Sequence, residues 1–202
     1  MIIHFICRGN SFRSIIAEAY LNSLEITDCR VLSSGATAAA DKARNLVYYQ
    51  MTLDLLERHG IRQFAKAGYG DQLTQSRLEE ADITVCMNQR VYDECLRCVT
   101  FPVSPHIWSV ADIGEPGRIS AIASERALYR EEAYQEIIKN VDRLTSCVPA
   151  ANDLNTWRFP ELSGGCGPGV SSSASGINTP PKTVGRAAAG GIATEAGRRA
   201  GR

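Results

Sequence analysis

The chain has 202 residues, 44% of them hydrophobic, and its 22 basic and 22 acidic residues give a formal net charge of zero. This composition supports one ordinary domain with a real core. The sequence contains no apolar run of membrane-spanning length and no basic-then-apolar signal segment, so we expect a cytoplasmic protein that does not bind membranes. Seven cysteines, an odd number, suit a reducing compartment better than a disulfide scaffold.

The first residues follow a pattern of strand, loop and helix. An apolar run from Ile2 to Ile6 predicts a strand, and helical spacing of apolar residues begins at Ile15, with Glu18 off the apolar face. The segment between them consists of Cys7, Arg8, Gly9, Asn10, Ser11, Phe12, Arg13 and Ser14. A loop in this position presents backbone N–H groups and the positive end of a helix dipole. We therefore expect an anion site with a cysteine in its floor.

The spacing of Cys7 and Arg13 suits chemistry on a phosphate group. Five intervening residues can wrap the backbone around one tetrahedral oxyanion and bring the planar guanidinium over two of its oxygens. The same N–H groups, Arg13 and the Ser14 hydroxyl would stabilise a thiolate, which is a nucleophile toward phosphorus. The spacing alone is a weak signal, but Gly9 and Asn10 supply the permissive residues that such a turn needs.

The rest of the chain alternates strands and helices. Further strands are expected at 30–34, 82–87 and 99–103, and further helices at 46–59, 74–80, 89–97 and 119–147. This alternation predicts an α/β fold: a doubly wound four-stranded parallel sheet with helices on both faces, whose ligands bind at the carboxyl ends of the strands. Residues 1–160 form the expected catalytic domain, and residues 161–202 form a Gly/Ser/Ala-rich basic tail that we expect to be disordered.

The segment from Phe5 to Tyr20 resembles the phosphate-binding signature of the low-molecular-weight protein tyrosine phosphatases, a family that also includes thioredoxin-coupled arsenate reductases. The similarity continues through 33–35, 53–60 and 79–87 and covers about residues 1 to 147. It implies a flavodoxin-like, phosphotyrosine phosphatase I-like fold and a cysteinyl-phosphate intermediate on Cys7. It also implies that Arg13 and the loop from Arg8 to Ser14 bind the phosphate, without a metal or an organic cofactor.

The resemblance also implies a general acid in a later loop. Family members carry a tryptophan and then an Asp-Pro pair whose aspartate protonates the leaving oxygen, and here Asp112 follows Trp108 by four residues. Ile113 stands in place of the proline, and the tyrosines that often follow are absent, which leaves the substrate open. Glu115 is an alternative acid. We expect Phe12, Tyr48, Tyr49 and the Asp112 loop to form the walls that select the substrate.

Three functions fit these observations. The first is a phosphomonoesterase, above all a protein tyrosine phosphatase, with a phosphorylated protein or a small phosphoester as its partner and no role for nucleic acid. The second is an arsenate reductase whose relay would use Cys95 and Cys98, although Phe12 occupies the loop position of that subfamily's second cysteine. The third is a non-catalytic phosphate-binding module. A zinc site at Cys95 and Cys98 is disfavoured because no second ligand pair exists in the sequence.

Overall fold

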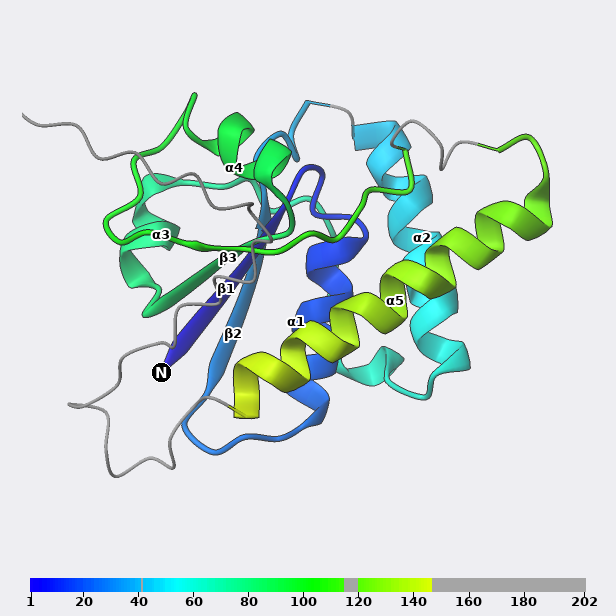
Figure 1. Ribbon diagram of the computed structural model, residues 1–202, viewed down its shortest axis with the longest axis horizontal. Helices are drawn as coiled ribbons and strands as arrows, with labels where there is room; N and C mark the ends of the chain where they lie inside the picture. Colours follow the sequence, from blue (N-terminus) through cyan, green and yellow to red (C-terminus); the bar gives the residue numbers. More distant parts are fainter. Residues whose placement is uncertain (41, 115–119, 147–202) are drawn as a thin grey trace, which may run out of the picture. The chain divides into compact units, whose positions relative to one another are not determined.

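The computed structural model describes residues 1–40, 42–114 and 120–146 (Figure 1). The strands are β1 (Ile2–Cys7), β2 (Arg30–Gly35), β3 (Ile83–Cys86) and β4 (His106–Ile107). The helices are α1 (Arg13–Ser23), α2 (Lys42–Arg58), α3 (Gln75–Glu80), α4 (Gln89–Cys95) and α5 (Ala123–Ser146), with a short 3₁₀ helix at Arg62–Phe64. The expected tail at 161–202 lies outside the described residues.

The four strands form one parallel sheet in the order β2-β1-β3-β4, as predicted. In this register Cys7, at the end of β1, lies opposite Gly35 of β2, while Phe5 pairs with Val85 of β3. The loops that follow β1 and β3 therefore leave the sheet at the same edge. A site at this edge draws its residues from both loops.

The predicted fourth strand at 99–103 is wrong. The edge strand is instead β4, where His106 pairs with Val85 and Ile107 with Cys86. Pro102 interrupts the apolar run and lacks the N–H that a ladder needs. Val99 packs instead into the core beside α4, and Val103 is exposed.

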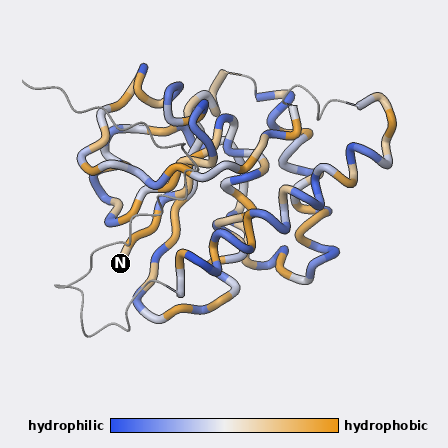
Figure 2. The backbone as a smooth tube through the Cα atoms, viewed as in Figure 1, coloured by the Kyte–Doolittle hydropathy of each residue, from blue (hydrophilic) through white to orange (hydrophobic). Residues whose placement is uncertain are grey.

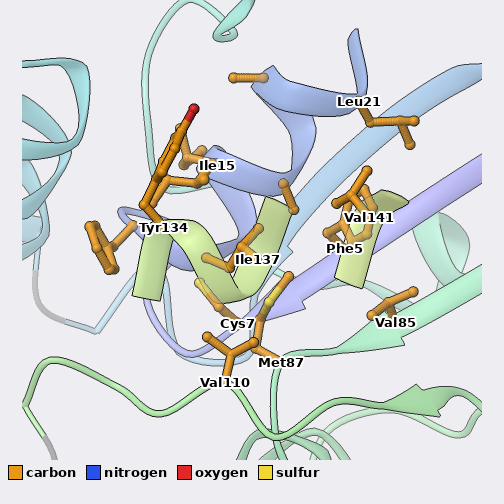
Figure 3. Close-up of a cluster of buried hydrophobic side chains, with 14 of the residues drawn as sticks. Phe5, Cys7, Ile15, Leu21, Val85, Met87, Val110, Tyr134, Ile137 and Val141 are labelled. Atoms are coloured by element: carbon orange, nitrogen blue, oxygen red, sulfur yellow. The ribbon is translucent and has the colours of Figure 1, made fainter. Parts of the chain in front are cut away.

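Alternation along the strands builds a core on each face of the sheet. Ile3, Phe5 and Cys7 of β1 point to the face covered by α1 and α5, while Ile6 points to the face covered by α3 and α4. Hydrophobic residues run along the strands in Figure 2, and α5 alternates between polar and apolar residues. Figure 3 shows the larger cluster, in which Cys7 lies with Met87, Val110 and Ile137. The predicted helices on both faces are confirmed.

Several helix boundaries differ from the sequence prediction. The helix expected from Leu46 begins at Lys42, the helix expected to end at Arg97 ends at Cys95, and the long last helix begins at Ala123. Two short helices begin at side-chain caps, where Thr74 accepts a hydrogen bond from the Arg77 N–H and Asn88 accepts one from Val91. No helix in the described ranges is long and apolar enough to cross a membrane.

Candidate active site

The loop between β1 and α1 surrounds the Cys7 thiol. The side chain is 3% exposed, and its Sγ accepts hydrogen bonds from the backbone N–H of Asn10 (3.2 Å) and from the Ser14 hydroxyl (3.0 Å). Both donors stabilise a thiolate more strongly than a thiol, because hydrogen bonds to a charged acceptor are the stronger ones. The structure thus places two of the predicted loop residues on the sulfur itself.

Asn10 sets the direction of the hydrogen bonds around Cys7. Its φ of 48° lies in the left-handed region, which asparagine tolerates better than most residues. Its Oδ1 accepts from Lys66 Nζ (2.6 Å) and from the Asp71 N–H (3.0 Å), so its Nδ2 is free to donate to Ser14 Oγ (3.0 Å). Since this donor points at the Ser14 oxygen, the Ser14 proton points at Cys7. Sequence reasoning missed Lys66 and Asp71, which stand more than fifty residues away in the chain.

A second branch of the same network ends at a buried carboxyl group. Asn10 Nδ2 also donates to Ser33 Oγ (2.9 Å), and the Ser33 hydroxyl donates to Glu18 Oε2. Glu18 is 6% exposed, and burial raises its pKa above the usual value while the Ser33 bond opposes that shift. Glu18 was predicted to lie off the apolar face of its helix. The structure instead buries Glu18 behind the loop, against β2.

Two glycines let the loop backbone pack closely. A Cβ on Gly35 would lie 2.7 Å from both the carbonyl oxygen of Arg8 and the backbone nitrogen of Asn10. A Cβ on Gly9 would lie 2.5 Å from Asn45 Oδ1. Backbone cannot yield as a flexible side chain can, so Gly35 is the more demanding of the two positions.

Arg13 connects the phosphate loop to the loop that follows β4. Its side chain is 3% exposed, Nη1 donates to the Val110 carbonyl oxygen (3.0 Å), and Nη2 lies 2.7 Å from Asp112 Oδ2. The later loop is fixed by the hydrogen bond from the Val110 N–H to the Met87 carbonyl and by Trp108, whose ring centroid lies 5.6 Å from that of Phe5. The structure therefore brings Arg13 and Asp112 together across 99 positions of sequence. Glu115 lies outside the described residues.

A hollow of about 230 Å³ opens above Cys7. Four arginines line it, namely Arg8, Arg13, Arg44 and Arg90, and Asp112 is the one acidic residue among the described residues of its lining. The lining also contains other residues that the sequence predicted for the site, namely Gly9, Ser11, Phe12 and Tyr48. Tyr49, which was expected in the wall, is instead 7% exposed and donates its hydroxyl to the Lys66 carbonyl oxygen. The lining has the charge to hold a dianion.

The four other cysteines within the described residues do not line this hollow. Cys86 and Cys95 belong to the core on the opposite face of the sheet from Cys7, and Cys98 is exposed. The hydrogen bond with Cys86, together with burial, raises the pKa of Cys95. No cluster of three or more metal-binding side chains occurs in residues 1–40, 42–114 and 120–146. Of the thiols in these described ranges, one, that of Cys7, lies beside the anion site.

Comparison with known proteins relates this site to one family. Residues 2–115, more than half of the chain, match the family model described as low molecular weight phosphotyrosine protein phosphatase. No curated protein matched the sequence. Wzb from Vibrio vulnificus, solved in complex with benzylphosphonate, superposes with a TM-score of 0.55 at 18% identity, covering 73% of this chain and 98% of its own.

Two further solved structures share the fold. The Drosophila arginine phosphatase DARP superposes with a TM-score of 0.55 at 18% identity, covering 75% of this chain and 100% of its own. The thioredoxin-dependent arsenate reductase of Corynebacterium glutamicum has a TM-score of 0.50 at 20% identity, covering 72% of this chain and 60% of its own. At these identities the structural similarities establish the fold alone.

Proposed function

The chain belongs to the low molecular weight phosphotyrosine protein phosphatase family, and we propose that it hydrolyses phosphomonoesters, above all phosphotyrosine in proteins, through a cysteinyl-phosphate intermediate. The observation that carries the proposal is the Cys7 sulfur, which accepts hydrogen bonds from Ser14 and from the Asn10 N–H at the floor of an arginine-lined hollow. A thiol held in this way is suited to attack a bound phosphate.

Binding of the phosphate uses the loop and Arg13. Backbone N–H groups between Arg8 and Ser14 would hold the equatorial oxygens, together with the Arg13 guanidinium. In the structure Arg13 Nη2 donates a hydrogen bond to the Asp112 carboxylate. A bound phosphate therefore competes with Asp112 for this guanidinium, and the displaced carboxyl group is left beside the leaving oxygen.

The reaction then runs in two displacements. The Cys7 thiolate forms a bond to phosphorus as the ester P–O bond breaks, and the Asp112 carboxylic acid gives its proton to the departing oxygen. In the second step a water molecule attacks phosphorus, the S–P bond breaks, and Asp112 takes the proton of the water. Ser14 and the Asn10 N–H stabilise the departing thiolate. Arg13 and the amides supply the positive charge, so the proposed mechanism uses no metal and no organic cofactor.

The cysteines bear on the cellular location and on the alternative functions of the protein. The nucleophile must remain reduced, which is why we propose a cytoplasmic location. An arsenate reductase needs further thiols that can reach Cys7, and the buried position of Cys86 and Cys95 on the other face of the sheet disfavours such a relay. A passive phosphate-binding module would not need the Ser14 hydrogen bond to sulfur.

The proposal is tested with p-nitrophenyl phosphate in the presence of a metal chelator. We expect the wild type to turn it over, Cys7→Ser to show no turnover, and Cys98→Ser, the matched substitution of an exposed cysteine, to retain the wild-type rate. Equal hydrolysis by the wild type and Cys7→Ser would refute the proposed nucleophile. Arsenate-dependent thiol consumption that disappears in Cys98→Ser would instead support the reductase.

A further inference from the structure

A second hollow adjoins the one above Cys7. It has a volume of about 320 Å³ and is lined mostly by residues of α2 and α5, two helices that Figure 1 shows next to one another. Arg44, Tyr48 and Ile113 line both hollows, so the two are neighbours across a shared wall. We call this second hollow the α2–α5 groove. Nothing in the proposed two-step reaction uses it.

The floor of the α2–α5 groove is apolar. Val47 and Met51 come from α2, and the rings and side chains of Tyr48 and Ile113 continue the apolar surface toward the active site. Val47 is 61% exposed. An apolar side chain bound in the groove would remove this surface from water.

The C-terminal end of α2 is held against the middle of α5. The ring of His59, which directly follows α2, stacks on Tyr134 of α5 with centroids 3.8 Å apart. His59 Nε2 also lies 3.0 Å from Glu131 Oε1. These contacts fix the position of α5 against α2 beyond the groove, so its two walls belong to one packed unit.

The rim of the groove is positive. Arg44 comes from α2, Arg126 and Arg130 come from α5, and no acidic residue lies among the described residues that line it. Within the described part of the chain Arg130 has no carboxylate partner, and burial together with Arg58 and Arg126 lowers its pKa. The positive charge of Arg130 therefore attracts carboxylates.

We propose that the α2–α5 groove binds the segment of a phosphorylated protein substrate that adjoins the phosphorylated residue, with an apolar side chain on the floor and a carboxylate at Arg126 and Arg130. The inference rests on the proposed function and specifies its substrate class. Because an extended chain advances about 3.3 to 3.6 Å per residue, residues adjoining the one in the Cys7 hollow reach the shared wall. The charge of the rim favours acidic segments over basic ones.

The test compares peptides with a substrate that is too small to reach the groove. Phosphotyrosine peptides carry leucine and glutamate on both sides of the phosphotyrosine, and matched peptides replace each glutamate by lysine or each leucine by serine. For each peptide kcat/KM is divided by the value for p-nitrophenyl phosphate. We expect the ratio to be about tenfold higher for the leucine and glutamate peptide than for the lysine peptide.

Variants then locate the preference. Arg126→Gln/Arg130→Gln should lower the ratio for the glutamate peptide by about threefold to tenfold, the loss of two partly exposed ion pairs, and Met51→Ser should reduce the preference for leucine. Arg97→Gln, an exposed arginine of the opposite side of the sheet, is the matched control. Equal ratios for all peptides, with p-nitrophenyl phosphate still hydrolysed, overturn the groove proposal alone. A wild type inactive on every substrate overturns the phosphatase proposal, and the groove proposal with it.

Discussion

Replacing Asp112 with asparagine separates proton donation from the contact that this side chain makes with Arg13. Asparagine keeps an oxygen that can accept from Arg13 Nη2, 2.7 Å away in the structure, and Arg13 also keeps its 3.0 Å hydrogen bond to the Val110 carbonyl oxygen. The guanidinium should therefore stay in place. What the variant loses is the acid, and general acid catalysis contributes about 10²-fold to 10⁴-fold to rate.

The expected loss depends on the leaving group. With phenyl phosphate, whose phenolate needs a proton, kcat/KM for Asp112→Asn should fall by about 10²-fold to 10⁴-fold, or roughly 3 to 5 kcal/mol in the barrier. With p-nitrophenyl phosphate the nitro group stabilises the phenolate, and the fall in kcat/KM should be much smaller. The two esters are compared by kcat/KM, which reports only the steps up to formation of the cysteinyl-phosphate and leaves out its hydrolysis, where Asp112 acts as base for both esters.

The same variant makes a second, opposite prediction for binding. Phosphate must displace the Asp112 carboxylate, which is 28% exposed, from Arg13, and a partly exposed ion pair is worth about 1 kcal/mol. Asp112→Asn should therefore lower the inhibition constant of inorganic phosphate by about fivefold. Asp93→Asn, an exposed acid of α4, serves as the control. An equal loss of kcat/KM with both esters, or weaker phosphate binding, would show that Asp112 acts only through the position of Arg13.

Two further outcomes follow from the packing around the loop. Gly35→Ala should lower kcat/KM by about 10²-fold because its Cβ would push on two backbone atoms of the phosphate loop. The control is Gly60→Ala, where φ is 71° and no atom lies near the new Cβ. This variant should lose about 1 kcal/mol of stability and keep the wild-type turnover. Burial, and then the charge of Arg77, lowers the pKa of His4 from 6.5 to about 4. As pH falls, His4 is therefore protonated in the unfolded chain before it is protonated in the folded protein. The free energy of unfolding should fall by up to about 3 kcal/mol as pH drops from 6.5 to 4. Urea titrations at several pH values should show that the free energy of unfolding falls less steeply with pH in His4→Gln than in the wild type. Equal pH dependence in the two proteins would contradict this assignment. Glu18, whose pKa is raised and whose effect on stability has the opposite sign, is present in both proteins.

The sheet illustrates how far local patterns reach. The first three strands and most helices follow from apolar runs and periodicity, because each of those signals lies within one segment. The edge strand does not, since β4 contains only His106 and Ile107 and is defined by its pairing with β3. An edge strand of two residues carries no periodicity to read, and the more apolar run before it is interrupted by Pro102.

What the sequence by itself determined is the phosphate loop. Cys7, Asn10, Arg13 and Ser14 lie within eight positions of one another, and a loop that short takes its shape from its own residues and the strand and helix beside it. The family resemblance added Asp112, and the structure brings that side chain to 2.7 Å from Arg13.

Only the tertiary structure decided what supports the loop and what surrounds it. Lys66 and Asp71 orient Asn10, Glu18 closes the buried branch, and Arg130 faces a groove built from two helices that are far apart in the chain. Each of these contacts depends on how helices and loops pack on the sheet. Separations of this size carry no signal in spacing or composition, because the chain between the partners can take many paths until the core fixes one.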